Sequence, residues 1–188
     1  MKTVETLRAE HEGVLTVLAQ LDRAVAAAEQ GVPVPRAIFA DIQEFFITFV
    51  DHCHHGKEEA EIFPRLEHGA TAALMAQLDE EHTEGHDLAA RYIAAVGGYL
   101  PGDAASGARL AAAARGYADF LRRHIELEDR ELFPAIEASL AGADDELVAA
   151  FDRIEAEVIG PGTHERLHGM IDSLAGRIDP YVAAPVGD

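Results

Sequence analysis

Apolar residues recur at spacings of three and four along nearly the whole chain, the pattern of amphipathic helices. No segment shows the long alternation of apolar and polar residues that is typical of strands. The first helix is expected to begin after Thr3 as its N-cap and to end near Gln30, because Gly31 and Pro33 follow. Its buried stripe is predicted to comprise Val4, Leu7, His11, Val14, Leu15, Leu18 and Leu21.

Three more long helices are predicted, over about residues 35–64, 71–96 and 103–140. Glycine and proline separate them, at 97–98, 101–102 and 142. Four long helices with short connections predict an all-α protein, an up-down-up-down antiparallel four-helix bundle over residues 1–142.

Residues 143–188 have no counterpart in this bundle pattern. We expect a helix over about 144–158, a break at Gly160-Pro161-Gly162, a shorter helix over about 163–177, and a loose tail over 180–188. This C-terminal helical extension is interpreted as a cap or docking element on the bundle.

Composition excludes several classes of partner. The formal net charge of −19 argues against nucleic acid and against an anionic membrane surface, both of which select basic proteins. No apolar stretch reaches the roughly 20 residues that span a bilayer, and the first residues lack the apolar centre of a signal peptide. Cys53 is the only cysteine, which fits a reducing cytoplasm. Ten histidines, however, call for an explanation.

A sequence phrase recurs in the two halves of the chain. His54-His-Gly-Lys-Glu58-Glu-Ala-Glu-Ile-Phe63-Pro64 is matched by His124-Ile-Glu-Leu-Glu128-Asp-Arg-Glu-Leu-Phe133-Pro134, and Glu10-His11 is matched by Glu81-His82. Each half therefore supplies a lone histidine and then a His/Glu pair.

Residues four apart lie on one face of a helix, and the inner faces of an antiparallel bundle converge. Five histidines and two glutamates are thereby predicted to meet: His11, His54, His82, His86, His124, Glu58 and Glu128. Imidazole and carboxylate together suit a divalent transition metal such as iron. Seven ligands exceed the four of a zinc site but fit two metals bridged by carboxylates.

These phrases resemble the HHE cation-binding type of hemerythrin-like proteins over about residues 3–140. The resemblance implies a non-haem centre of two iron ions with an oxo or hydroxo bridge. His82, His86 and His124 would hold one iron, His11 and His54 the other, and Glu58 and Glu128 would bridge them. The iron with fewer histidines would keep an open position for a small ligand such as dioxygen or nitric oxide. Leu15, in the place that corresponds to His86, would create that inequality.

Alternatives remain at several positions. In oxygen-carrying hemerythrins the last acid stands one residue later, at Asp129 here, although helix geometry and the repeat favour Glu128. Some HHE-type proteins lack the second histidine of the His-x-x-x-His pair, so His55 or a tyrosine could replace His86, although packing is the commoner role for a residue placed like His55. Zinc or manganese could substitute for iron.

The remaining chemistry-bearing residues carry weaker signals. His52 and His68 are expected at the surface, and surface placement is also favoured for the His164/His168 pair over a second metal site. Glu61 and Glu131 are either partners that orient the imidazoles or parts of a solvated face. The dry wall of the open iron position is predicted to comprise Ile47, Val50, Tyr117, Phe120, Leu15 and Leu78, with the Tyr117 hydroxyl as its polar group.

Three functions are compatible with this pattern. The first is a binding module that takes up dioxygen or senses oxygen, nitric oxide or iron. The second is an enzyme acting on peroxide or nitric oxide, or an iron donor for damaged iron centres, and the sequence leaves enzymatic activity undecided. The third is a metal-stabilised interaction domain whose protein partner the sequence does not identify.

Overall fold

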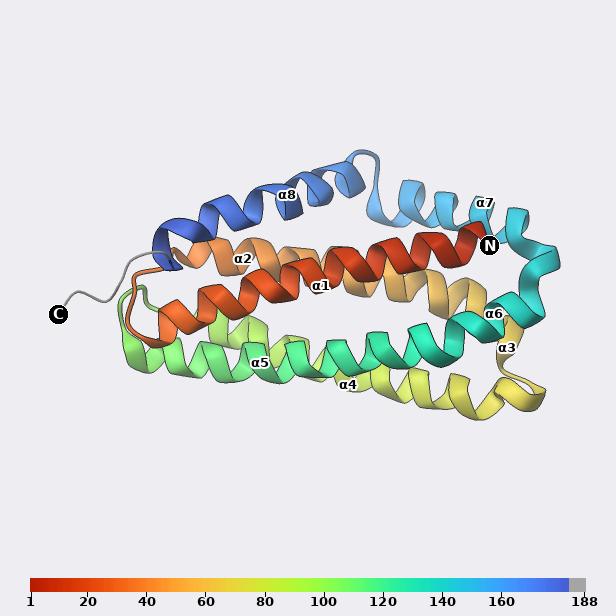
Figure 1. The fold of residues 1–188 in the computed structure, drawn as a ribbon, viewed down its shortest axis with the longest axis horizontal. Helices are drawn as coiled ribbons and strands as arrows, with labels where there is room; N and C mark the ends of the chain where they lie inside the picture. Colours follow the sequence, from red (N-terminus) through yellow and green to blue (C-terminus); the bar gives the residue numbers. More distant parts are fainter. Residues whose placement is uncertain (183–188) are drawn as a thin grey trace.

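The computed structural model describes residues 1–182, and helices account for all of the regular structure in that range. Four long helical rods lie side by side along the long axis of the molecule (Figure 1). The first is α1 (Lys2–Glu29) and the third is α4 (Ala72–Gly97). The second combines α2 (Arg36–Phe45), η1 (Phe46–His55), η2 (Glu58–Ile62) and α3 (Phe63–Leu66), and the fourth combines α5 (Ala104–Leu127), η4 (Glu128–Leu132) and α6 (Phe133–Leu140).

The rods alternate in direction, so the predicted antiparallel four-helix bundle is confirmed. Short connections turn the chain at each end. At one of these ends Gly31 and Gly102 lie close together and adopt positive φ angles of 81° and 87°, a conformation that side chains disfavour. A third glycine has a packing role, because a Cβ atom on Gly107 would lie 2.1 Å from the carbonyl oxygen of Ala28. Gly107 therefore lets α5 approach the backbone of α1.

The extension folds back along the bundle instead of projecting from it. It consists of η5 (Ala141–Ala143), α7 (Asp144–Ile154), η6 (Glu155–Ile159) and α8 (Thr163–Val182), and it runs beside α1 and α2 (Figure 1). The predicted break is present, since Gly160 and Gly162 both have positive φ. The second helix is longer than predicted: Pro180 lies inside α8, which ends at Val182. The rest of the predicted tail lies outside the described residues.

Thr3 links the extension to the start of the bundle. We predicted Thr3 as an N-cap, but α1 begins at Lys2 with Met1 as its cap residue. The Thr3 hydroxyl donates instead to Asp144 at 2.7 Å, and Asp144 also accepts the backbone N–H groups of Lys2 and Thr3 at 3.0 Å. A carboxylate from α7 thus satisfies orphan donors of the first turn of α1.

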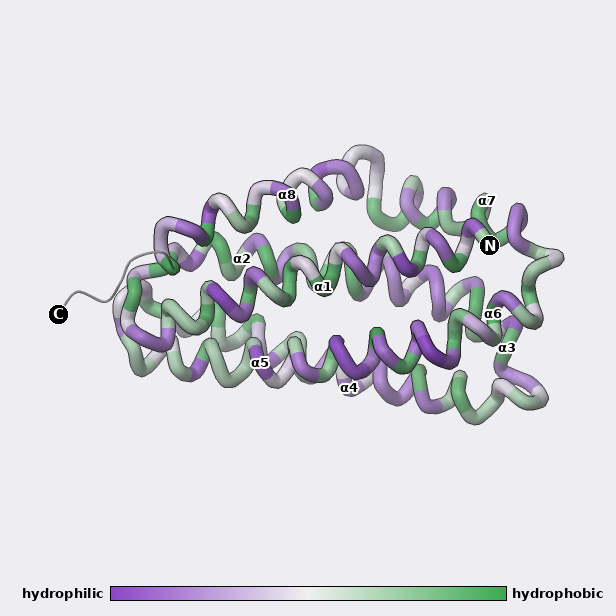
Figure 2. The backbone as a smooth tube through the Cα atoms, viewed as in Figure 1, coloured by the Kyte–Doolittle hydropathy of each residue, from purple (hydrophilic) through white to green (hydrophobic). Residues whose placement is uncertain are grey.

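The apolar core is divided into two clusters. One surrounds Leu18, Phe46 and Leu121, and the other surrounds Leu7, Phe63 and Phe133. Hydrophobic residues recur as green segments along each helix of the tube (Figure 2). Leu15 belongs to neither cluster and is 39% exposed, so its prediction as a core residue was wrong.

Three π-helical stretches interrupt the second and fourth rods, η1, η2 and η4. Two of them end immediately before the Phe-Pro pairs, where proline has no N–H to continue the normal helical hydrogen-bond ladder. The wider π turn changes which side chains face inward, and such turns are frequent at functional sites. No helix among residues 1–182 has the length and apolar character needed to cross a bilayer.

Candidate metal centre

A layer of buried polar side chains separates the two apolar clusters. Its inner members are between 0% and 4% exposed, and they come from all four rods: His11, His54, His55, Glu58, His82, His124 and Glu128. Burying so many ionisable groups without compensation is costly. The layer contains six of the seven predicted site residues. It also contains His55, which was not in the predicted set, and it lacks His86.

Two clusters of candidate ligands face each other across this layer. His11, His54 and Glu128 form one, and His55, His82 and His124 form the other, with ligand atoms within 4.8 Å of one another in each. The Nε2 atoms of His11 and His54 are 3.0 Å apart. Two ligand atoms at right angles around an ion at about 2.1 Å, an ordinary metal–imidazole distance, would have this separation.

The two glutamates lie between the histidine clusters. Glu128 is 3.1 Å from Nε2 of both His11 and His124, one from each cluster. Glu58 lies 3.7 Å from Nε2 of His54 and 3.6 Å from Nε2 of His82. Each carboxylate is therefore close to a histidine of both clusters, as a bridging ligand must be. The alternative acid, Asp129, is 39% exposed and contacts the outer nitrogen of His11.

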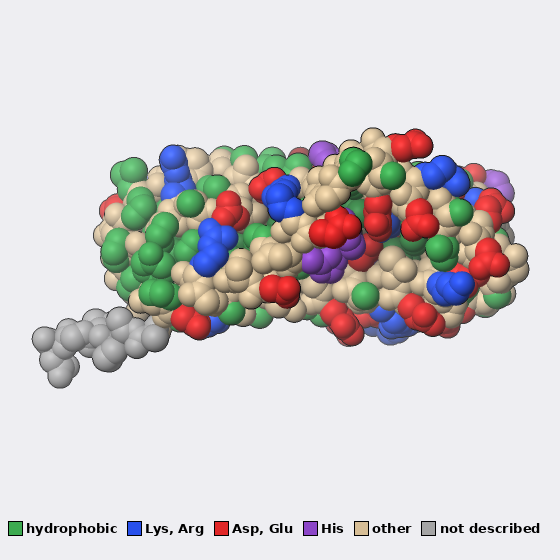
Figure 3. Space-filling model, turned by 90° about the horizontal axis from the view of Figure 1, so that it is seen from above, with side chains coloured by type: hydrophobic (Ala, Val, Ile, Leu, Met, Phe, Trp, Pro, Cys, Tyr) green, Lys and Arg blue, Asp and Glu red, His purple; other side chains and the backbone are tan. Residues whose placement is uncertain are grey.

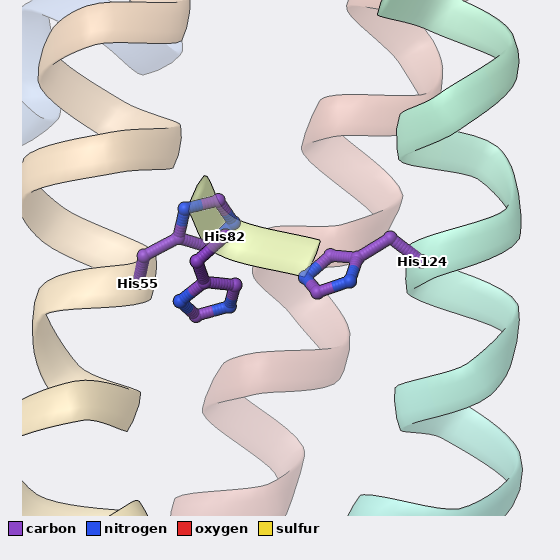
Figure 4. A group of neighbouring side chains, drawn as sticks. All are labelled: His55, His82 and His124. Atoms are coloured by element: carbon purple, nitrogen blue, oxygen red, sulfur yellow. The ribbon is translucent and has the colours of Figure 1, made fainter. Parts of the chain in front are cut away.

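His55 occupies the place that we predicted for His86. His55, His82 and His124 converge from η1, α4 and α5 (Figure 4). The His86 side chain is 54% exposed and pairs with Asp51, so the structure does not bring it to the centre. The prediction assumed α-helical geometry, in which neighbours such as His54 and His55 diverge. The π turn of η1 buries both.

The two clusters differ in their number of histidines, as predicted, but the residue that causes the difference is not the predicted one. Leu15, which we expected opposite His86, points toward solvent. The repeat places Ile125 where the first half has His55. The additional imidazole of one cluster is therefore His55, without an equivalent in the second half.

An outer ring of carboxylates holds the imidazoles through Nδ1. Glu10 lies 2.8 Å from His54, and Glu81 lies 2.8 Å from His124. In the same way, Glu59 lies 2.7 Å from His82 and Asp129 lies 3.3 Å from His11. The four contacts obey the two-fold relation of the repeat, in which Glu10 corresponds to Glu81 and Glu59 to Asp129. Such partners fix the tautomer and orientation of metal-binding histidines.

The sequence pointed to different acids for this role. Glu61 and Glu131 pair with Arg65 and Arg130 instead. The missed signal lay in the repeat itself. The Glu that precedes each lone histidine is duplicated, and so is the acid that follows Glu58 and Glu128.

The phenylalanines of the two Phe-Pro pairs make equivalent contacts, each with the lone histidine of the other half. The ring of Phe63 lies 5.3 Å from that of His82, and the ring of Phe133 stacks on His11 at 5.0 Å. Each phenylalanine thus closes the layer against the second apolar cluster. In each repeat of the aliphatic-Phe-Pro phrase, the phenylalanine ring packs against an imidazole of the layer, and the proline follows the end of a π turn.

Burial and close neighbours shift the pKa values of the groups in this layer in opposite directions, and Glu58 is the carboxyl group that favours protonation. Burial raises the pKa of Glu58 to about 8, and the charge of Glu128 adds to the rise. Burial opposes protonation of His124, but the carboxylates of Glu128 and Glu81 raise its pKa to about 10. Burial, together with the neighbouring His82 and His54, lowers the pKa of His55 well below its ordinary value. A neutral imidazole is the form that binds a metal.

Seven inner atoms in the described part of the chain lack a partner with the geometry of a hydrogen bond, although several of them lie close to one another. Among residues 1–182, no partner is found for either oxygen of Glu58 and Glu128, for Nε2 of His82 and His124, or for Nδ1 of His55. Leaving one buried polar atom unpaired costs about 1–3 kcal/mol. These atoms all face the interior of one layer, while the outer nitrogens of His82 and His124 are satisfied. The donor set therefore fits cations placed between the two clusters.

A cavity of about 200 Å³ opens beside the centre, with His55 in its wall. The other walls are mainly apolar and include Phe46, Ile47, Tyr117 and Gly85. Asp51 and His86 line it as well. Ile47 and Tyr117 of the predicted apolar wall line this space. It adjoins the cluster that contains His55, however, and not the His11/His54 cluster beside which we predicted the wall.

The remaining histidines lie outside the layer. The side chains of His52 and His68 are 56% and 89% exposed, as expected. His164 and His168 pack against each other and against Phe49, and within the described part of the chain they join no group of candidate metal ligands.

Comparison with known proteins identifies the family of this arrangement. The model of the family described as the hemerythrin HHE cation binding domain matches residues 2–136, which include every member of the inner layer. Neither the curated proteins nor the solved structures include a significant match to the chain. The chain therefore belongs to the hemerythrin HHE cation-binding domain family.

Proposed function

We propose that this protein binds two iron ions in the buried layer and uses them to bind dioxygen or to sense oxygen, nitric oxide or iron. The observation that carries the proposal is the set of buried, unpaired donor atoms on Glu58, Glu128, His82, His124 and His55. These atoms face one another within bonding reach of common centres. A cation-free role would leave their desolvation uncompensated.

We assign the ligands by cluster. His11 and His54 hold one ion, His55, His82 and His124 hold the other, and Glu58 and Glu128 bridge the two. A set rich in imidazole with two carboxylates favours iron over magnesium or calcium, which prefer oxygen ligands. When bound, the two ions supply reversible electron exchange with a small ligand. Zinc or manganese would fit the same donors.

A binding or sensing role is supported by the surroundings of the centre. A small, mostly apolar cavity adjoins His55, so a ligand held in it would lie next to the ion assigned to His55, His82 and His124. Such walls admit an uncharged diatomic molecule more readily than a charged substrate. Tyr117 is buried and lines the cavity, so its hydroxyl is one of the polar groups, with His55, Asp51 and His86, that can orient a ligand there.

Metal content per chain and the visible spectrum of protein produced with iron test the proposal. We expect two iron ions per chain and absorption bands that change reversibly when the reduced protein meets oxygen. His54→Ala and His124→Ala should each lower the metal content, whereas the exposed His68→Ala should not. Unchanged metal content in both buried variants would refute the assignment. Turnover of peroxide or nitric oxide by the iron-loaded protein would instead favour an enzyme.

A further inference from the structure

Lys57 breaks the two-fold symmetry of the centre. It stands one residue before Glu58, where the second half has Leu127. The Lys57 side chain is 0% exposed, although lysine is almost never fully buried unless paired. A buried cation at this position therefore needs anionic partners, and the structure provides two.

The two partners come from opposite sides. The Lys57 ammonium donates to Glu10 of α1, and it donates to Glu155 of η6 at 2.6 Å. The other oxygen of Glu10 accepts the Nδ1–H of His54 at 2.8 Å. A continuous chain of charged hydrogen bonds thus runs from Glu155 in the extension to a proposed ligand. The Cys53 thiol also contacts the Lys57 ammonium. Glu10, Cys53 and Glu155 are close enough together to hold a metal, but the ammonium occupies the position between Glu10 and Glu155.

The second half lacks this connection to the extension. Glu81, the equivalent of Glu10, holds His124 with one oxygen and accepts from Gln77 of its own helix with the other, at 2.8 Å. Within residues 1–182, the cluster of His11 and His54 is the only one with such a link to the extension. The space-filling view of this face shows acidic side chains beside histidine near its middle (Figure 3), whereas the Lys57 side chain is fully buried beneath the surface.

We propose that Glu155 is a positioning residue for the metal centre, so that the C-terminal extension tunes the ion held by His11 and His54 through Lys57 and Glu10. The inference rests on the proposed function. Glu155 shares the charge of Lys57, which leaves Glu10 free to hold the His54 N–H strongly. Without Glu155, Lys57 draws on Glu10 alone, and His54 becomes a poorer electron donor to the ion.

Glu155→Gln tests this, with Glu157→Gln as the matched control. Glu157 is an exposed acid two positions further along the same stretch, so both variants change the net charge equally. Metal affinity is measured by competition with a chelator. We expect Glu155→Gln to weaken binding of one ion roughly tenfold, the lower end of the effect of outer partners, while the second ion is unaffected. Glu157→Gln should match the wild type.

A second readout uses the metal-free protein. The imidazole N–H resonances should show a shift of the His54 Nδ1 proton in Glu155→Gln, while the His124 Nδ1 proton stays in place. Circular dichroism establishes that each variant is folded, and Glu155→Asp, which retains the charge, should recover most of the affinity.

The outcomes separate the two proposals. Equal behaviour of Glu155→Gln and Glu157→Gln in a wild-type background that binds two ions overturns this inference alone. Equal weakening of both ions by Glu155→Gln also overturns it, because that result indicates a general structural role. A wild-type chain that binds no metal overturns the proposed function and this inference together.

Discussion

The identity of the fifth histidine offers the sharpest test of the centre. Sequence spacing selects His86, whereas the structure selects His55. His55 is 4% exposed, and its ring lies 3.9 Å from that of His82. Loss of outer partners of metal ligands typically costs 10–100-fold in affinity. Loss of a direct ligand should therefore weaken one ion by at least about 100-fold, or about 2.8 kcal/mol at 1.4 kcal/mol per tenfold.

The same calculation gives a small effect for His86. Its side chain and that of Asp51 are 54% and 32% exposed, and an exposed ion pair contributes about 0–1 kcal/mol. His86→Ala should therefore change metal affinity less than about fivefold.

Metal content per chain and chelator competition, measured on His55→Ala and His86→Ala side by side, decide between the two. We expect His55→Ala to keep one ion and lose the other, while His86→Ala keeps both. If His86→Ala lost an ion and His55→Ala kept two, the ligand assignment and the role given to the π turn would both be refuted.

Three further predictions concern packing, access and pH. Gly107→Ala should destabilise the protein by about 1–3 kcal/mol in urea unfolding, because its Cβ would meet backbone of α1. Gly116→Ala on the same helix, with open space among the described atoms around it, should stabilise by about 0.5–1 kcal/mol, and the opposite order would contradict the packing argument. Ala89→Phe should narrow the cavity and slow ligand uptake in stopped-flow absorbance without lowering metal content. Hydrogen bonds from Thr3 lower the pKa of Asp144 below 3.8, so its contribution is complete above that pH and is lost as the pH falls through the lowered value. The lower unfolding midpoint expected for Asp144→Asn at pH 7 should therefore approach the wild-type midpoint below about pH 4, and a constant difference would argue against the carboxylate's role.

The sequence alone determined the architecture and most of the centre. Spacings of three and four, with glycine and proline at the ends, predicted four rods and the break before Thr163, because helix periodicity and backbone restrictions are local properties. Duplication of the His/Glu phrases identified His11, His54 and His124 for the same reason. A short repeat that agrees with helical periodicity already defines a common face.

Only the tertiary structure decided which neighbours of those residues face inward. His55 took the place predicted for His86 because the chain adopts π turns in η1, which helical spacings of three and four did not predict. The outer carboxylates are duplicated in the sequence, but their contacts cross between rods, as with Glu10 and His54, so only the fold shows which imidazole each carboxylate holds. The contact of Glu155 with Lys57 joins residues that are far apart in the chain, and it exists because the extension folds back along the bundle.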